Sequence, residues 1–196
     1  PIDLNGDGKI DVVSSATGDT SGAISWYQQP ADPTTTPWPK HIMTSFAGAT
    51  RFAFGDLDGD GQVDLAAISP TKAQVAWFPH PAQVTDVWNG WVLANYASDS
   101  TDTREPLDIA IADMNGDGQL DVVVLSNNPA SVYYYTPGAD IAAAWVEHRV
   151  VAIAPNSLGL FAVSDILGRG LSDVIVPVVQ EDDNTRDRID RFINPG

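Results

Sequence analysis

The sequence contains no cysteine. This excludes disulfides, metal sites built from thiolates and a cysteine nucleophile, although it does not identify the redox compartment. Positive charge is also scarce, with 10 Lys and Arg against 26 Asp and Glu and a formal net charge of −16. Such a surface repels nucleic-acid phosphates and anionic lipid, so we expect no nucleic-acid partner. There is no run of 18 apolar residues, so no membrane span is expected.

The chain has ample material for a core. Hydrophobic residues make up 43% of its 196 residues and charged residues only 18%. This composition is too apolar for a disordered chain. The length suits one domain or one piece of a larger protein.

An acidic nonapeptide repeats along the chain. The pattern Asp-x-Asn/Asp-Gly-Asp-Gly-x-x-Asp begins at Asp3, Asp56 and Asp113, and an altered copy spans Asp165 to Asp173. The copies begin 52 to 57 residues apart. This spacing lies near the period of propeller blades, roughly 40–50 residues.

Short runs of strand-forming residues surround each copy. Each acidic turn is followed by an apolar run, an aromatic run that ends near proline, a run that opens with Trp, and a run that leads into the next turn. The Trp-led runs begin at Trp38, Trp91 and Trp145. All are rich in β-branched and aromatic residues and are bounded by turn formers, so they indicate strands. We therefore predict an all-β fold, a β-propeller or partial propeller of four-stranded antiparallel blades, with repeats at about 1–48, 49–104, 105–157 and 158–196.

The predicted strands number fourteen, or about three and a half blades. The first repeat lacks the strand before its turn, and the last lacks its Trp-led strand. Two alternatives stay open. The chain is part of a longer propeller, or it closes by pairing its terminal strands, within itself or with a second copy.

The acidic turns have the spacing of a calcium loop. Oxygen ligands at positions 1, 3 and 5 converge, a backbone carbonyl at position 7 adds to them, and position 9 closes the shell around a cation that takes 6–8 oxygens. Glycine at position 6 permits the sharp turn. We predict three calcium sites with these ligands: Asp3, Asn5, Asp7, Lys9 and Asp11; Asp56, Asp58, Asp60, Gln62 and Asp64; Asp113, Asn115, Asp117, Gln119 and Asp121.

These turns differ from an EF-hand, whose loop ends in a bidentate Glu at position 12. Ser14, Ala67 and Val124 occupy that position here, and the flanking runs are strands. A single Asp/Gly turn of this kind could bind nothing, but three matching copies favour calcium. The fourth turn should not hold calcium, because Leu167 and Arg169 replace ligands. The Arg169 guanidinium either pairs with Asp165 or Asp173 in place of the cation, or points to solvent.

The sequence resembles the FG-GAP/VCBS repeat in three features. These are the acidic turn, the apolar strand that follows it, and aromatic strands such as Ile-Ser-Trp-Tyr at 24–27. The resemblance covers nearly the whole chain. It implies calcium-bearing propeller blades of the kind found in integrin α-chains, some lectins and some secreted sugar-active enzymes, with calcium in a structural role. It does not by itself fix an activity.

No catalytic constellation is visible, so an enzymatic role is left open and not favoured. His41 and His148 occupy the same repeat position, which indicates a structural role in the blade, whereas His80 is irregular. Trp88 lies outside the repeat pattern as we align it and is our one candidate for an exposed ligand contact.

Three functions remain. We expect a calcium-stabilised, secreted recognition module, with carbohydrate as the favoured, lectin-like ligand. The alternatives are the propeller part of a secreted lyase or dehydratase that acts on sugars, and a structural module that docks proteins. The extracellular location follows from the calcium loops, because cytosolic calcium would not keep them filled.

Overall fold

The structure is a computed structural model that describes residues 2–15, 22–143, 145–153, 160–178 and 188–194. Its described part is all-β, apart from two short 3-10 helices, η1 (Pro70–Lys72) and η2 (Tyr96–Ser98). Neither helix is long enough to cross a membrane.

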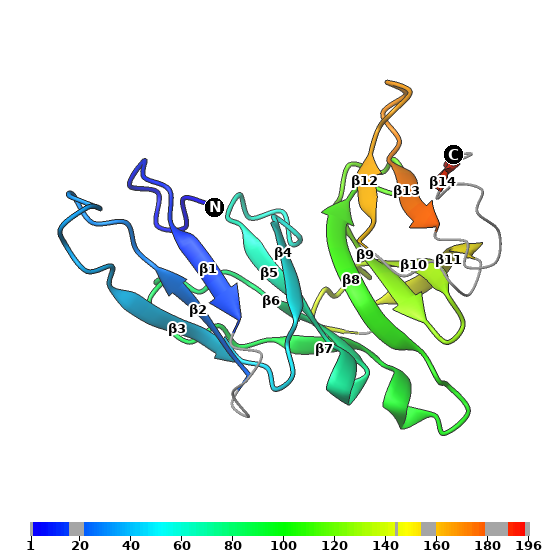
Figure 1. The fold of residues 1–196 in the computed structure, drawn as a ribbon, viewed down its shortest axis with the longest axis horizontal. Coiled ribbons are helices and arrows are strands. Elements are labelled where there is room, and N and C mark those ends of the chain that lie inside the picture. Colours follow the sequence, from blue (N-terminus) through cyan, green and yellow to red (C-terminus); the bar gives the residue numbers. More distant parts are fainter. Residues whose placement is uncertain (1, 16–21, 144, 154–159, 179–187, 195–196) are drawn as a thin grey trace.

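Fourteen strands form four antiparallel sheets in the described residues, with three, four, four and three strands as predicted. The sheets follow one another along the chain (Figure 1). Sheet 1 contains β1 (Val12–Ser15), β2 (Ala23–Tyr27) and β3 (Lys40–Ser45); sheet 2 contains β4 (Arg51–Gly55), β5 (Asp64–Ser69), β6 (Gln74–Phe78) and β7 (Trp91–Asn95); sheet 3 contains β8 (Glu105–Ala112), β9 (Asp121–Asn127), β10 (Ser131–Thr136) and β11 (Val146–Ala152); sheet 4 contains β12 (Ala162–Ser164), β13 (Asp173–Val178) and β14 (Arg188–Phe192).

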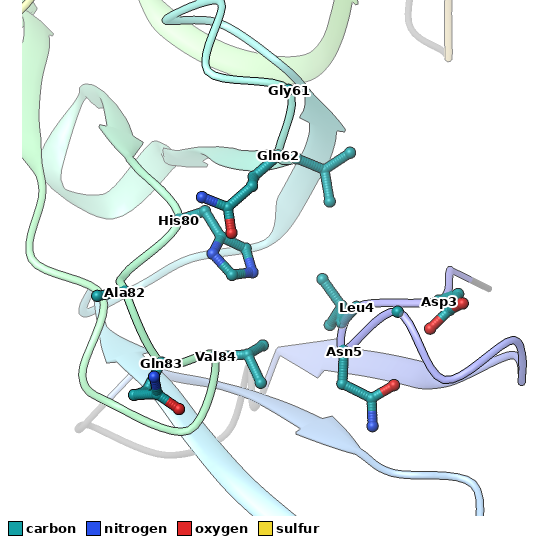
Figure 2. Close-up of a pocket in the computed structure, with 11 residues that line it drawn as sticks. Asp3, Leu4, Asn5, Gly61, Gln62, His80, Ala82, Gln83 and Val84 are labelled. Atoms are coloured by element: carbon teal, nitrogen blue, oxygen red, sulfur yellow. The ribbon is translucent and has the colours of Figure 1, made fainter.

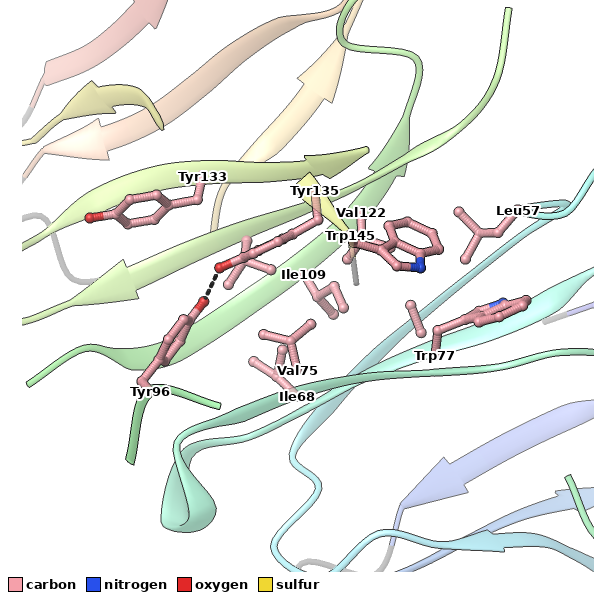
Figure 3. Packing of buried hydrophobic residues seen from close by; sticks show 12 residues of the cluster. Leu57, Ile68, Val75, Trp77, Tyr96, Ile109, Val122, Tyr133, Tyr135 and Trp145 are labelled. Atoms are coloured by element: carbon pink, nitrogen blue, oxygen red, sulfur yellow. Dashed lines mark hydrogen bonds between the residues drawn. The ribbon is translucent and has the colours of Figure 1, made fainter. Parts of the chain in front are cut away.

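Three apolar clusters lie between successive sheets. Because adjacent residues of a strand face opposite sides, a central strand contributes to two clusters. In β5, Leu65 and Ala67 pack towards sheet 1, whereas Ala66 and Ile68 pack towards sheet 3. Figure 3 shows the cluster between sheets 2 and 3, where the rings of Trp77 and Trp145 lie 5.9 Å apart. The sheets thus stack face to face through their apolar side chains, which accounts for the nearly unbroken apolar runs.

Polar groups also join the segment after β7 to sheet 3. The hydroxyls of Tyr96 and Tyr135 lie 2.6 Å apart (Figure 3). The Arg104 guanidinium lies 4.2 Å from the centre of the Tyr96 ring and donates to Glu147 on β11. It also holds the pKa of Asp102 below its usual value through hydrogen bonds. This cluster ties the segment after β7 to sheet 3.

A pair of stacked rings recurs on the last two strands of the first three sheets. The pairs are Trp26–His41 at 4.6 Å, Trp77–Trp91 at 5.3 Å and Tyr134–His148 at 4.6 Å between ring centres. His41 and His148 therefore occupy equivalent places in their sheets, as the repeat position predicts, and each stacks on a ring of the neighbouring strand.

The positions of these ring pairs identify Trp88 as a member of the repeat. Trp38, Trp88 and Trp145 each precede the second ring of their pair by three residues. The indole N–H of Trp88 donates to the Val84 carbonyl, as that of Trp145 donates to the Ile141 carbonyl. The prediction that Trp88 is an exposed contact is wrong. Its side chain is 0% exposed in the cluster between sheets 1 and 2, and its backbone N–H donates to Met43 on β3.

Candidate functional site

The acidic turns share one backbone geometry. In the second turn, the carboxylate of Asp56 accepts the N–H groups of Gly59 at 2.8 Å and Gly61 at 3.0 Å. Both glycines have positive φ, at +77° and +86°, which a residue with a side chain rarely adopts. Asp113 accepts the matching N–H groups in the third turn. The local sequence therefore shapes the loop with its own hydrogen bonds.

The aspartate at position 9 is buried in each turn, and in the first and second turns it also fastens the turn to the strand beside it. Asp11, Asp64, Asp121 and Asp173 are all fully buried. In the second turn, Asp64 accepts the Leu57 N–H at 3.0 Å and the His80 N–H, beyond the end of β6, at 2.8 Å. Asp11 makes the same two kinds of contact in the first turn. In these two turns the last predicted ligand thus also links the turn to the strand beside it.

The second turn brings three predicted ligands together. Carboxylate oxygens of Asp56, Asp58 and Asp64 all lie within 4.8 Å of one another, a group that could hold a metal ion. Asp60 is not a member of this group, and its Oδ1 accepts the Gln62 N–H at 2.7 Å. In the first and third turns an asparagine replaces the acid at position 3. Asn5 and Asn115 there accept the N–H of the residue two positions later.

The electrostatics of the third turn fit a cation. Asp121 is buried, and its Oδ1 has no hydrogen-bond partner among the described residues. Burial, together with the charges of Asp117 and Asp113, raises the pKa of Asp121 to about 7. An oxygen-rich group of acids with an unsatisfied buried oxygen has the chemistry that hard divalent cations prefer.

The raised pKa of Asp121 makes the free energy of unfolding depend on pH, and a bound cation should cancel this dependence. Between an unfolded pKa near 4 and the folded value of about 7, the folded protein binds the extra proton on Asp121, so without metal its stability should fall as pH rises. A cation favours the carboxylate and removes this penalty. Thermal unfolding from pH 5 to 8 should show a gap between calcium and EDTA that widens with pH, and Asp121→Asn should reduce the widening. A gap that is constant with pH would contradict this.

The fourth turn has the same geometry with a different charge at its centre. Asp165 accepts the N–H groups of Arg169 and Gly170, as Asp3 accepts those of Asp7 and Gly8 in the first turn. The Arg169 guanidinium donates to buried Asp173 at 3.0 Å and to the Asn194 carbonyl at 3.0 Å. Of the two alternatives from the sequence, the structure therefore shows the pairing with Asp173. A positively charged group from within the chain therefore pairs with the carboxylate that is a predicted calcium ligand in the other three turns.

A groove of about 430 Å³ lies between the first and second turns. Figure 2 shows Leu4 and Asn5 of the first turn facing Gln62 and His80 across it. Gln83 and Val84, on the segment after β6, line a further side. A groove of about 250 Å³ lies at the matching place between the second and third turns. The first groove is therefore the more spacious of the two.

Buried Trp88 supports one side of this groove. The ring of His80 lies edge-on to the Trp88 indole at 5.0 Å, and its Nδ1 is buried without a partner among the described residues. Gln83 is exposed, and its side-chain amide makes no hydrogen bond to any described residue. The sequence singles out His80 as irregular but gives no sign of Gln83, because the two turns that complete the groove are far apart in the chain.

Comparison with known proteins places the chain in a family. A search of curated proteins finds no match. Among solved structures, the crystal structure of the V. cholerae biofilm matrix protein Bap1 is similar, with 17% sequence identity and a TM-score of 0.43. The match covers 90% of this chain and 33% of that one, so the chain spans about a third of the length of that protein. The model for the FG-GAP-like repeat matches residues 3–67 and 56–124, more than half of the sequence. The chain therefore belongs to the family of proteins built from FG-GAP-like repeats.

Proposed function

We propose that the chain is a calcium-stabilised β-propeller recognition module that works outside the cell and binds carbohydrate. The observation that carries this proposal is the pairing of the acidic turns with a groove between the first two turns, lined by both polar and apolar side chains. The family and the four stacked antiparallel sheets support a propeller arrangement of the repeats.

Calcium would occupy the three acidic turns. Asp56, Asp58 and Asp64 would hold it in the second turn, and the Gln62 carbonyl and Asp60 would complete the shell. The first and third turns would use the matching residues. Three bound ions would change the formal charge from −16 to −10 and relieve the repulsion among crowded carboxylates. Because extracellular calcium is abundant, such sites favour a location outside the cell.

The groove has the chemistry of a neutral sugar site. Amide and imidazole groups, here Gln83 and His80, can donate to and accept from hydroxyl groups. Leu4 and Val84 offer apolar contact to the carbon face of a ring. No carboxylate partner holds the exposed Gln83 amide among the described residues, so it is available to a ligand.

A glycan array with labelled protein in millimolar calcium tests this function, and titration calorimetry with a positive glycan locates the site. Gln83→Ala should weaken binding about tenfold, the loss expected for one or two hydrogen bonds. Gln119→Ala is the matched control, because Gln119 lines the smaller groove and should leave the affinity unchanged. If no glycan binds in calcium, the carbohydrate proposal fails. Equal losses in the two variants would remove the groove as its site.

A further inference from the structure

The third acidic turn lacks a hydrogen bond that the other three turns have. In those three, Oδ1 of the aspartate at position 9 accepts a backbone N–H from a residue just beyond the end of the aromatic strand. The bonds run from Gln29 to Asp11 at 2.8 Å, from His80 to Asp64 at 2.8 Å and from Asn194 to Asp173 at 3.0 Å. In the third turn, Oδ1 of Asp121 has no partner among the described residues, although the side chain is 0% exposed.

A proline accounts for the missing bond. One aromatic residue in each sheet pairs with the residue that follows the position 9 aspartate, and these residues are Tyr27, Phe78, Tyr135 and Phe192. The N–H donor is the second residue after this aromatic residue, and in the third turn that residue is Pro137. Proline has no backbone N–H, so it cannot supply the bond. The other oxygen of Asp121 is satisfied, because it accepts the Met114 N–H at 2.9 Å.

The first turn is the matched comparison for the third, because both have aspartate at positions 1, 5 and 9 and asparagine at position 3. Asp11 has both carboxylate oxygens bonded to N–H groups, whereas Asp121 has only one. At position 7, the Lys9 ammonium lies 3.2 Å from the Asp7 carboxylate, whereas the third turn has neutral Gln119. An exposed ion pair contributes little, so the difference at position 9 should dominate.

An unsatisfied buried oxygen increases what a turn gains from a cation. A buried acceptor without a donor is costly, and the third turn bears this cost while it holds no metal. The N–H groups on Asp11 offset part of its negative charge in the first turn. Asp121 lacks one of these groups and also lies in the field of the Asp113 and Asp117 charges. A cation should therefore relieve more unfavourable free energy in the third turn than in the first.

We propose that the third turn binds calcium more tightly than the first, and that Pro137 sets this difference by withholding an N–H from Asp121. The inference rests on the calcium occupancy in the proposed function. It makes Pro137 a determinant of cation affinity, although the residue is not itself a predicted ligand. As the calcium concentration falls, the third turn should stay filled after the first has emptied.

Calcium titrations in an Asp58→Ala background test this ranking, because the first and third turns should then provide the two remaining sites. Competition with a fluorescent chelator should resolve two affinities at least about fivefold apart, the ratio that ~1 kcal/mol produces. Asp117→Ala should remove the tighter site, and Asp7→Ala, at the matched position of the first turn, should remove the weaker one. Pro137→Ala should bring the two affinities within about twofold of each other. Lys9→Gln should change the weaker affinity by less.

Melting in EDTA gives a second measurement that needs no calcium. Pro137→Ala supplies the missing N–H and should melt above Pro30→Ala, the matched control, which loses a proline one position beyond Gln29. The control is needed because loss of a proline by itself lowers stability through the unfolded state.

The outcomes separate this inference from the calcium proposal beneath it. If no calcium binds to any variant, both fail. If two ions bind with equal affinity, if Asp117→Ala keeps the tighter site, or if Pro137→Ala melts no higher than Pro30→Ala, the role of Pro137 is overturned while the calcium sites stand.

Discussion

Removal of calcium with EDTA is expected to lower the melting temperature substantially. A ligand that binds only the folded state at about 100 times its dissociation constant adds about 2.7 kcal/mol to the free energy of unfolding. In a chain of this size 1 kcal/mol corresponds to roughly 2–4 °C, so each filled turn should add about 5–10 °C. The stabilisation arises because the cation neutralises neighbouring carboxylates, such as those that the fold brings together in the second and third turns.

Single substitutions assign the effect to particular turns. Calorimetry should find three calcium ions in the wild type and two in Asp58→Ala, with a smaller calcium-induced rise in melting temperature. Asp165→Asn is the matched control in the fourth turn, where Arg169 pairs with Asp173. It should keep the whole calcium-induced rise, whatever its own stability. Identical melting curves in calcium and EDTA would contradict structural calcium, and an equal loss in Asp165→Asn would contradict this assignment of the sites.

The second large effect is expected at Trp88. Truncation of a fully buried large aromatic side chain costs about 3–5 kcal/mol, and Trp88→Ala should fall in this range. It would also leave the segment after β6 without its anchor against sheet 1. Urea unfolding, followed by tryptophan fluorescence and by circular dichroism, measures the loss.

Trp38→Ala provides the comparison at the same repeat position. Trp38 is half-buried, so its loss should cost only about 1 kcal/mol. A large difference between the two variants would show that burial between successive sheets, and not the tryptophan itself, determines the energy. Losses of similar size would contradict the role assigned to Trp88 in the repeat.

The sequence predicts the strands because their signals are local. Each sheet follows from apolar and aromatic runs separated by turn residues, and the numbers of strands per sheet match the structure. The turns are equally local, since Asp56 and its neighbours bond to backbone groups within five residues. The Arg169–Asp173 pair could be stated as one of two alternatives, but choosing between them required the position of the side chain.

Other features depend on contacts between distant segments. Trp88 appeared to lie outside the repeat because Trp91, three residues later, is also a tryptophan. Only the stacking of Trp91 on Trp77 shows that Trp91 takes the place of His41 and His148. The groove likewise joins the first turn to residues nearly 80 positions away, and no spacing in the sequence brings these parts together.

The guanidinium in the fourth turn gives this protein an internal charge that dilution and chelators cannot remove. Ions held in the other turns would exchange with the surroundings, whereas Arg169 is tethered covalently within four residues of its carboxylate. The stability of the first three turns would then depend on the concentration of divalent ions, whereas that of the fourth turn would not. When divalent ions are withdrawn, unfolding should begin in the N-terminal sheets, and the last turn should keep its shape longest.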